Sequence, residues 1–215
     1  MKNHRILLCI LWLTLLQSCG PPDLADPQIL NKARKEAIPL GSLKRELKYE
    51  ILMLYLDQDG EPFTGWVRED FESKKIKSIG YLLKGQKTGL WIAWHENGER
   101  KLETHWKKDS LEGKFLSWHP DGNPHVIGQT HDGEVDGEWV EYYSNGQLMA
   151  ESINTVGKLV SIQVWLPDGT PCHASKVKKG NGSFNRYEEN GSMLRRTFLD
   201  GVETKREWSF WKKTG

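Results

Sequence analysis

Two histidines at matching positions are the first candidates for metal binding. His95 and His119 each follow a tryptophan and shortly precede an Asn-Gly or Asp-Gly pair. On equivalent strands of neighbouring hairpins they would be separated by two strand spacings, about 9–10 Å. Zinc ligands must each reach the metal at about 2.0–2.1 Å, and the third matching position is Tyr143. We therefore expect both histidines to end strands, and we expect no metal or other cofactor.

The carboxylates and the remaining cysteine offer no better catalytic arrangement. Glu103 and Glu151 match one another two repeats apart, which is about 19 Å on the same strand spacing, whereas acid–base pairs face each other across about 5–10 Å. Cys172 precedes His173, but adjacent strand residues point to opposite faces, so we expect a lone, unreactive thiol. The sequence contains no nucleophile elbow, phosphate loop or Cys-x-x-Cys motif. It therefore predicts a protein that is not an enzyme.

Composition excludes several other classes of protein. The 215 residues carry 30 Lys and Arg against 29 Asp and Glu, a formal charge of +1, so no basic field is available to bind nucleic acid. Hydrophobic residues make up only 37%, while glycine contributes 21 residues and tryptophan 10. This balance favours short strands and turns over a helical bundle, a dinucleotide-binding fold or a multi-pass membrane protein.

The first 18 residues have the order of a secretory signal peptide. Lys2 and Arg5 give a positive start, and residues 6–16 form an apolar run that is too short for the ~20 residues a membrane-spanning helix needs. Residues 16–19, Leu-Gln-Ser-Cys, resemble a bacterial lipobox. That resemblance implies removal of residues 1–18, lipid attachment at Cys19 and a place in the bacterial cell envelope, at the outer membrane if the cell is Gram-negative. An ordinary signal peptide with an incidental cysteine is the alternative.

Residues 19–48 are expected to form a lipidated tether, because prolines interrupt regular structure there. Asp26 followed by Pro27 is typical of a helix N-cap with proline at the first helical position. This pattern predicts a short helix over residues 27–37, ended before Pro39. We expect it to be a solvated spacer.

A repeat of 24 residues occupies the rest of the chain, residues 49–215. Leading glycines stand at positions 65, 89, 113 and 137, and Asn-Gly or Asp-Gly pairs end at positions 98, 122 and 146. Weaker copies follow at residues 165–169 and 182–191, and residues 55–60 resemble a capping half-repeat. A second turn signal recurs at residues 84–85, 132–133, 156–157 and 200–201. A fixed period of this length indicates a repeat architecture.

Each repeat is expected to be one β-hairpin, because Asn-Gly and Asp-Gly between apolar runs are strong hairpin signals of the type I′ class. The sequence thus predicts an all-β protein, an elongated antiparallel meander of about twelve strands and on the order of 60 Å long. Alternation places two columns on one face: Ile92, Leu116, Val140 and Trp94, Trp118, Tyr142. A third column, Trp91, Phe115 and Trp139, lies on the opposite face. We expect this column to be exposed, either as a binding surface or merely as support for the sheet.

The unit Gly-x-Trp-x-x-Trp/Tyr-x-x-Asn-Gly and its following strand, seen best at residues 89–98 and 137–146, resembles the MORN repeat in its bacterial variant form. The resemblance covers about residues 50–211. It implies a repeat scaffold without shared catalytic residues, and some bacterial members are associated with antitoxins.

Taken together, the sequence predicts a membrane-anchored lipoprotein that presents a repeat sheet to a protein or an envelope polymer. Two alternatives are an antitoxin-like inhibitor of one cognate protein and, less favoured, an envelope enzyme, which would need a polar pocket that a flat sheet rarely forms.

Overall fold

The computed structural model describes residues 20–48 and 52–210. The predicted signal peptide (residues 1–18) and the predicted lipid attachment site Cys19 lie outside the described residues. No described helix is long and apolar enough to cross a bilayer.

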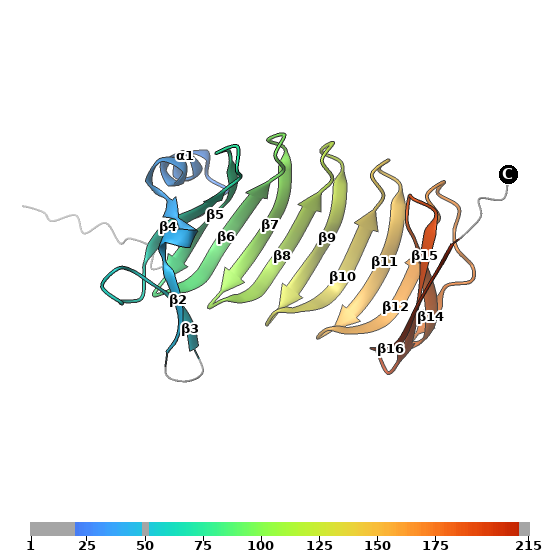
Figure 1. Cartoon of the computed structure of the whole chain (residues 1–215). Coiled ribbons are helices and arrows are strands. Elements are labelled where there is room, and N and C mark those ends of the chain that lie inside the picture. Colours follow the sequence, from blue (N-terminus) through green and yellow to red (C-terminus); the bar gives the residue numbers. More distant parts are fainter. Residues whose placement is uncertain (1–19, 49–51, 211–215) are drawn as a thin grey trace, which may run out of the picture.

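One long antiparallel sheet dominates the described chain (Figure 1). The elements in chain order are α1 (Pro27–Glu36), β1 (Ile38–Pro39), η1 (Leu40–Ser42), β2 (Lys44–Lys48), β3 (Leu52–Leu56), β4 (Gly65–Asp70), β5 (Ile76–Leu83), β6 (Gln86–Trp94), β7 (Arg100–Lys107), β8 (Ser110–Trp118), β9 (Pro124–His131), β10 (Glu134–Tyr142), β11 (Leu148–Thr155), β12 (Lys158–Val164), β13 (Lys176–Lys178), β14 (Asn181–Tyr187), β15 (Ser192–Leu199) and β16 (Val202–Phe210). The predicted all-β meander is confirmed: 14 strands follow one another as β1 and then β4 to β16. Only the β1–β4 pair is parallel, and β2 and β3 form a separate hairpin.

The two sets of turns differ in geometry, and only one of them is of the expected type. At the Asn97–Gly98 pair the Gly98 N–H donates to the carbonyl of His95 at 2.9 Å, and glycine alone has a positive φ, 97°. A type I′ turn needs positive φ at both central residues, so the type I′ prediction is wrong for the pairs that end at residues 98, 122 and 146. It holds at the second set of turns, where both residues have positive φ, as at Asp132 (48°) and Gly133 (87°).

The predicted short helix is confirmed as α1, but it is not a solvated spacer. The Asp26 side chain caps it by accepting the N–H of Gln28 at 2.7 Å. Leu24 and Ala33 are fully buried and pack with Ile79, Ile92 and Trp94 on one face of the sheet; we call this the outer face. The helix is drawn onto the sheet because these side chains bury apolar surface there.

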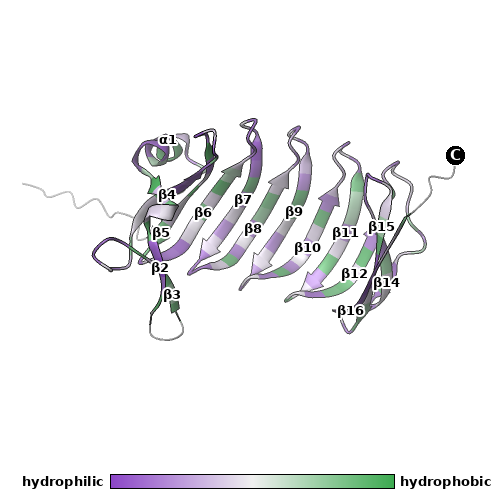
Figure 2. Cartoon of the chain, viewed as in Figure 1, coloured by the Kyte–Doolittle hydropathy of each residue, from purple (hydrophilic) through white to green (hydrophobic). Residues whose placement is uncertain are grey.

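The opposite, inner face carries the column of Trp91, Phe115 and Trp139. At its N-terminal end, η1 and the β2–β3 hairpin lie beside Val67, Leu82 and Trp91, with Leu40 and Tyr55 among the packed side chains. At the C-terminal end, the sheet curls so that Phe184 of β14 and Phe198 of β15 pack with residues of β11 to β13 (Figure 1). Figure 2 shows apolar residues recurring along the central strands and hydrophilic residues gathering at the turns.

The inner column holds the single layer together by placing aromatic rings over small residues of the preceding strand. A Cβ added to Gly80 would lie 1.9 Å from the Trp91 ring, and one added to Gly128 would lie 2.1 Å from the Trp139 ring. Residues 80, 104, 128 and 152, one period apart, are Gly, Thr, Gly and Ser. The rings therefore bury apolar area within the sheet itself, and Trp91 is in addition covered by η1 and the β2–β3 hairpin.

Gly128→Ala is expected to lower the free energy of unfolding by about 1–3 kcal/mol, because the added methyl overlaps the Trp139 ring in a packed site. Urea unfolding of both proteins measures the difference. Gly41→Ala is the matched control, since nothing lies within 4 Å of a Cβ at that position. Equal stability of the two variants would refute the packing of Trp139 over Gly128.

Candidate binding groove on the inner face

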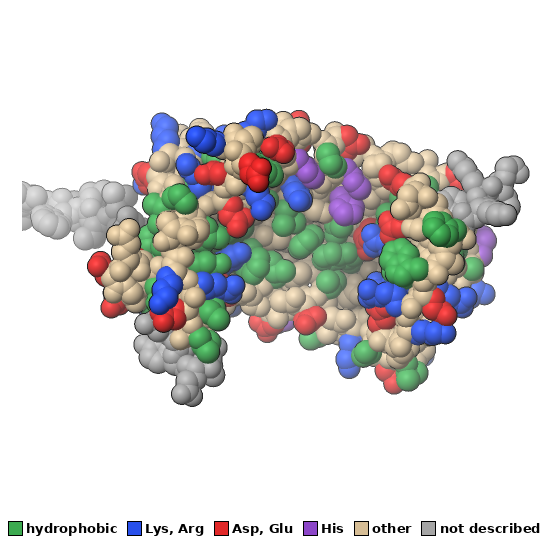
Figure 3. All heavy atoms as spheres, viewed as in Figure 1, with side chains coloured by type: hydrophobic (Ala, Val, Ile, Leu, Met, Phe, Trp, Pro, Cys, Tyr) green, Lys and Arg blue, Asp and Glu red, His purple; other side chains and the backbone are tan. Residues whose placement is uncertain are grey.

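The inner face forms a groove between two raised ends, which we call the inner groove (Figure 3). Apolar side chains gather along its middle. Its floor consists of the column Trp91, Thr104, Phe115, Gly128, Trp139 and Ser152 and of the neighbouring row Ala93, Leu102, Ser117, Val126, Glu141 and Ala150. The envelope enzyme was disfavoured because a flat sheet rarely forms a pocket, but this face is not flat: the curl at one end and the hairpin at the other give it depth.

The three predicted column residues differ in exposure. Trp91 is only 7% exposed, so the expectation of an exposed ladder is wrong at this residue, which η1 and the β2–β3 hairpin cover. Phe115 and Trp139 are half-buried, and their ring centroids are 5.0 Å apart. These two rings are the part of the column that a partner can reach.

A cavity of about 270 Å³ lies at the C-terminal end of the inner groove. Trp139, Phe184 and Phe198 supply aromatic walls, and Arg186 and Arg196 reach its surface. The Arg196 guanidinium lies over both phenylalanine rings, at 5.5 and 5.3 Å from their centroids. The cavity can therefore hold an apolar group, while the two arginines, each paired with a glutamate, form its polar border.

The ion pairs of Arg186 hold the strands that form this cavity in place. Arg186 Nη1 donates to Glu141 Oε2 at 2.5 Å and joins β14 to β10 across 45 residues. Arg186 Nε also donates to Glu188 at 3.1 Å. Burial alone would lower the pKa of Arg186, but the two carboxylates outweigh it and raise that pKa. The pairing closes the curl of the sheet.

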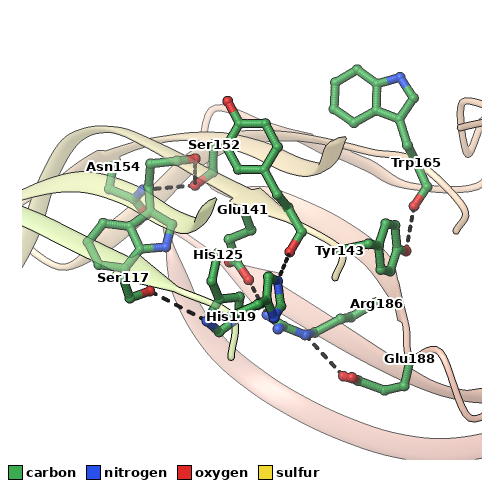
Figure 4. A network of polar contacts seen from close by, with 12 residues as sticks. Ser117, His119, His125, Glu141, Tyr143, Ser152, Asn154, Trp165, Arg186 and Glu188 are labelled. Carbon is green, nitrogen blue, oxygen red and sulfur yellow. Dashed lines mark hydrogen bonds and ion pairs between the residues drawn. The ribbon is translucent and has the colours of Figure 1, made fainter. Parts of the chain in front are cut away.

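A polar cluster borders the inner groove beside this ion pair (Figure 4). The rings of His119 and His125 lie 4.5 Å apart, and His125 Nδ1 is 3.4 Å from the Ser117 hydroxyl. Burial, and then the neighbouring His119, lower the pKa of His125. A neutral His125 can donate or accept a hydrogen bond, so this border offers polar contacts to a bound segment.

The matching histidines link successive repeats. His95 Nε2 lies 2.9 Å from the carbonyl oxygen of Trp118, and His119 Nε2 lies 3.0 Å from that of Tyr142. A carbonyl only accepts, so Nε2 carries the proton in both rings. Tyr143, the third matching residue, donates to Trp165 O at 2.8 Å in the same way. The described residues contain no group of side chains suited to hold a metal ion.

The remaining sequence candidates lie apart from one another. Glu103 pairs with Arg100, and Glu151 is exposed on the outer face. Cys172 is buried in the C-terminal cluster, with its Sγ 3.3 Å from the Tyr187 hydroxyl. The structure does not bring these groups together.

Sequence reasoning missed Phe184, Arg186, Lys87 and Trp106. A signal existed for Phe184, because the copy that begins at Gly182 aligns it with Trp139. None existed for Arg186, whose partner Glu141 is 45 residues away. Lys87 and Trp106 meet Trp91 only through the fold.

Comparison with known families agrees with this architecture. The family described as the MORN repeat variant matches residues 87–108 and 135–153. The two segments begin 135 − 87 = 48 residues apart, which is two periods of the sequence repeat. They cover most of the hairpins β6–β7 and β10–β11. No curated protein matches the chain.

Glu203→Gln is expected to destabilise the fold at neutral pH and to lose that effect in acid. Hydrogen bonds from Arg206 and then Arg196, against the opposing effect of burial, lower the pKa of Glu203 from 4.5 to about 2. A depressed carboxyl pKa contributes stability above the unfolded pKa, and this contribution disappears as the pH falls towards the folded pKa. Urea unfolding of both proteins between pH 7 and pH 2 should give a difference that is constant above about pH 5 and shrinks below it. A difference that does not change with pH would contradict this role.

Proposed function

We propose that this protein is a lipid-anchored binding module of the bacterial cell envelope. A diacylated Cys19 holds it at the membrane, and the inner groove binds an extended segment of a protein partner. The match to the MORN repeat variant suggests a binding or scaffold role. The proposal adds to this general role a membrane anchor and a kind of partner.

The partly exposed apolar floor of the inner groove is the main support for a binding role. Phe115 stays partly exposed on its floor, as do Leu102 and Trp139 next to the two end cavities, and no buried core cluster of the described residues includes these three side chains. Aromatic side chains provide large contact area at interfaces for little loss of conformational entropy. The groove runs across the strands, so a bound segment crosses successive repeats and meets similar contacts in each.

A protein partner fits the inner groove better than a uniform polymer does, because the two ends of the groove differ in chemistry. The C-terminal end has an aromatic cavity bordered by two arginines, whereas the N-terminal end has two tryptophans and Lys87. A polypeptide can present a different side chain to each end. A polymer of identical units cannot use that difference.

Lipid attachment supports the membrane role physically. Each acyl methylene that enters the bilayer contributes about 0.8 kcal/mol, and two chains are needed for stable anchoring. The signal-like order of residues 1–18 and the Cys19 that follows them support this assignment.

Cys19→Ser is expected to move the protein from the membrane fraction to the soluble fraction in its native cells, because the thiol that receives the lipid is gone. Fractionation followed by immunoblotting measures the change. Cys9→Ser removes the other N-terminal cysteine and should leave the partition as it was. Membrane association of the Cys19→Ser protein at the original level would refute lipid anchoring.

A photo-crosslinking amino acid in place of Ser117, on the inner face, is expected to give a discrete protein adduct in cells. The same amino acid in place of Ile127, which is 42% exposed on the outer face, should give none. Thermal unfolding of both variants checks that they fold alike. Equal adducts from the two faces, or an adduct with glycan in place of protein, would overturn the proposed function.

A further inference from the structure

A second, smaller cavity of about 190 Å³ lies at the N-terminal end of the inner groove. Leu40, Leu102, Trp91 and Trp106 give it apolar walls, and Lys87 reaches into the same lining. The two indole rings meet edge to face with their centroids 6.5 Å apart. We call this cavity the indole pocket.

Two hydrogen-bond donors of the indole pocket have no acceptor among the described residues. Trp91 Nε1 is the one buried side-chain polar atom there without a hydrogen-bond partner. The Lys87 ammonium lies over both indole rings, 4.4 Å from the Trp91 centroid and 4.7 Å from that of Trp106. No carboxylate of the described residues lies within ion-pair distance of it. A buried donor left without an acceptor loses its hydration without gaining a hydrogen bond in return, which is unfavourable.

The other polar groups around the indole pocket are already paired. Trp106 Nε1 donates to Thr104 Oγ1 at 2.9 Å, and Ser78 Oγ donates to Glu69 Oε2 at 3.1 Å. Asp109 accepts the backbone N–H of Lys87 itself at 2.8 Å. The Trp91 indole N–H and the Lys87 ammonium are therefore the two groups of the pocket that lack a hydrogen-bond partner within the described chain, and their complement is a hydrogen-bond acceptor.

The charges of Lys87 and Glu69 in the indole pocket favour a ligand with a single negative charge. Burial lowers the pKa of Lys87, although Glu69 and Asp109 act in the opposite direction and Arg45 lowers it further. An anion beside the ammonium would relieve that desolvation. A dianion is less suited, because Glu69 lines the same cavity.

We propose that the indole pocket binds a carboxylate carried on an apolar body, which in the bound partner is an acidic side chain. One carboxylate oxygen accepts from the Lys87 ammonium. The other accepts from Trp91 Nε1–H, which is buried and is reached only when the side chains that cover it shift, while the adjoining methylenes contact Leu40 and Trp106. This inference rests on the proposed function for the identity of the ligand, but the pocket's preference for a carboxylate can be tested without the partner.

The probe is benzoate, titrated into the full chain carrying Cys19→Ser, with benzyl alcohol as the neutral analogue and inorganic sulfate as the dianionic one. The readout is the indole N–H resonance of Trp91, identified by its loss in Trp91→Phe. Benzoate is expected to move this resonance saturably, and the two analogues are not. Equal response to benzyl alcohol or stronger response to sulfate would overturn the assignment.

Lys87→Met keeps the length of the side chain and removes its charge, so it should weaken benzoate binding at least about tenfold, as loss of a charge-assisted hydrogen bond does. Lys101→Met, at an exposed lysine of β7, is the matched control and should leave the affinity unchanged. Unchanged affinity in Lys87→Met overturns the proposal, provided that its thermal unfolding matches that of the parent chain. If Lys87→Met misfolds, the same comparison is made with Lys87→Gln.

The two proposals fail separately. A partner adduct at Ser117 that persists unchanged in Lys87→Met and in excess benzoate would refute the acidic side chain in the pocket and leave the inner groove as a binding site. Specific benzoate binding without any adduct at Ser117 would uphold the carboxylate site and refute the proposed function.

Discussion

A single sheet must bury apolar surface without a second layer to receive it, and this constraint shapes the whole protein. The central strands meet it by placing an aromatic ring of one strand over a small residue of the strand before, as Trp139 lies over Gly128. The ends meet it differently: α1 covers the outer face at one end, and β14 and β15 curl over the inner face at the other. The inner groove is the space that remains between these coverings.

Hydrogen bonds at the turns join each repeat to the next one along the sheet. His95 and His119 reach a carbonyl of the next repeat, and Tyr143 continues the series with a different side chain. The amides near the same turns show how such a series tolerates substitution. Asn97 donates to the carbonyl of Pro120 at 2.7 Å. The residue matching it is Asp121, whose side chain has no N–H to donate, and the Asn123 side chain donates to Ser144 O at 2.8 Å instead. The requirement is for a donor at that turn, not for one residue type.

The fold could be predicted largely from the sequence because its information is local and periodic. Glycine spacing, alternation and turn pairs each act within one hairpin, and Asp26 with Pro27 marks the start of α1. The depth of the inner face could not be predicted, because it depends on contacts between distant residues. Arg186 and Glu141 are 45 residues apart, and nothing near either of them in the sequence indicates the other. The same holds for the indole pocket, where η1 covers a tryptophan that alternation alone placed on an open face. The turn at Lys108 and Asp109 could not be predicted from turn residues, since both have positive φ although the turn contains no glycine.

The packing of residues 21–24 determines how far the domain can stand from an acylated N-terminus. A Cβ on Gly89 would lie 3.0 Å from Pro21, and Leu24 has no exposed surface. Five residue steps separate Cys19 from Leu24, a reach of at most about 18 Å even when fully extended. With Cys19 acylated as proposed, the α1 end of the protein stays within that reach of the headgroups. The N-terminal end of the inner groove would then open close to the bilayer surface.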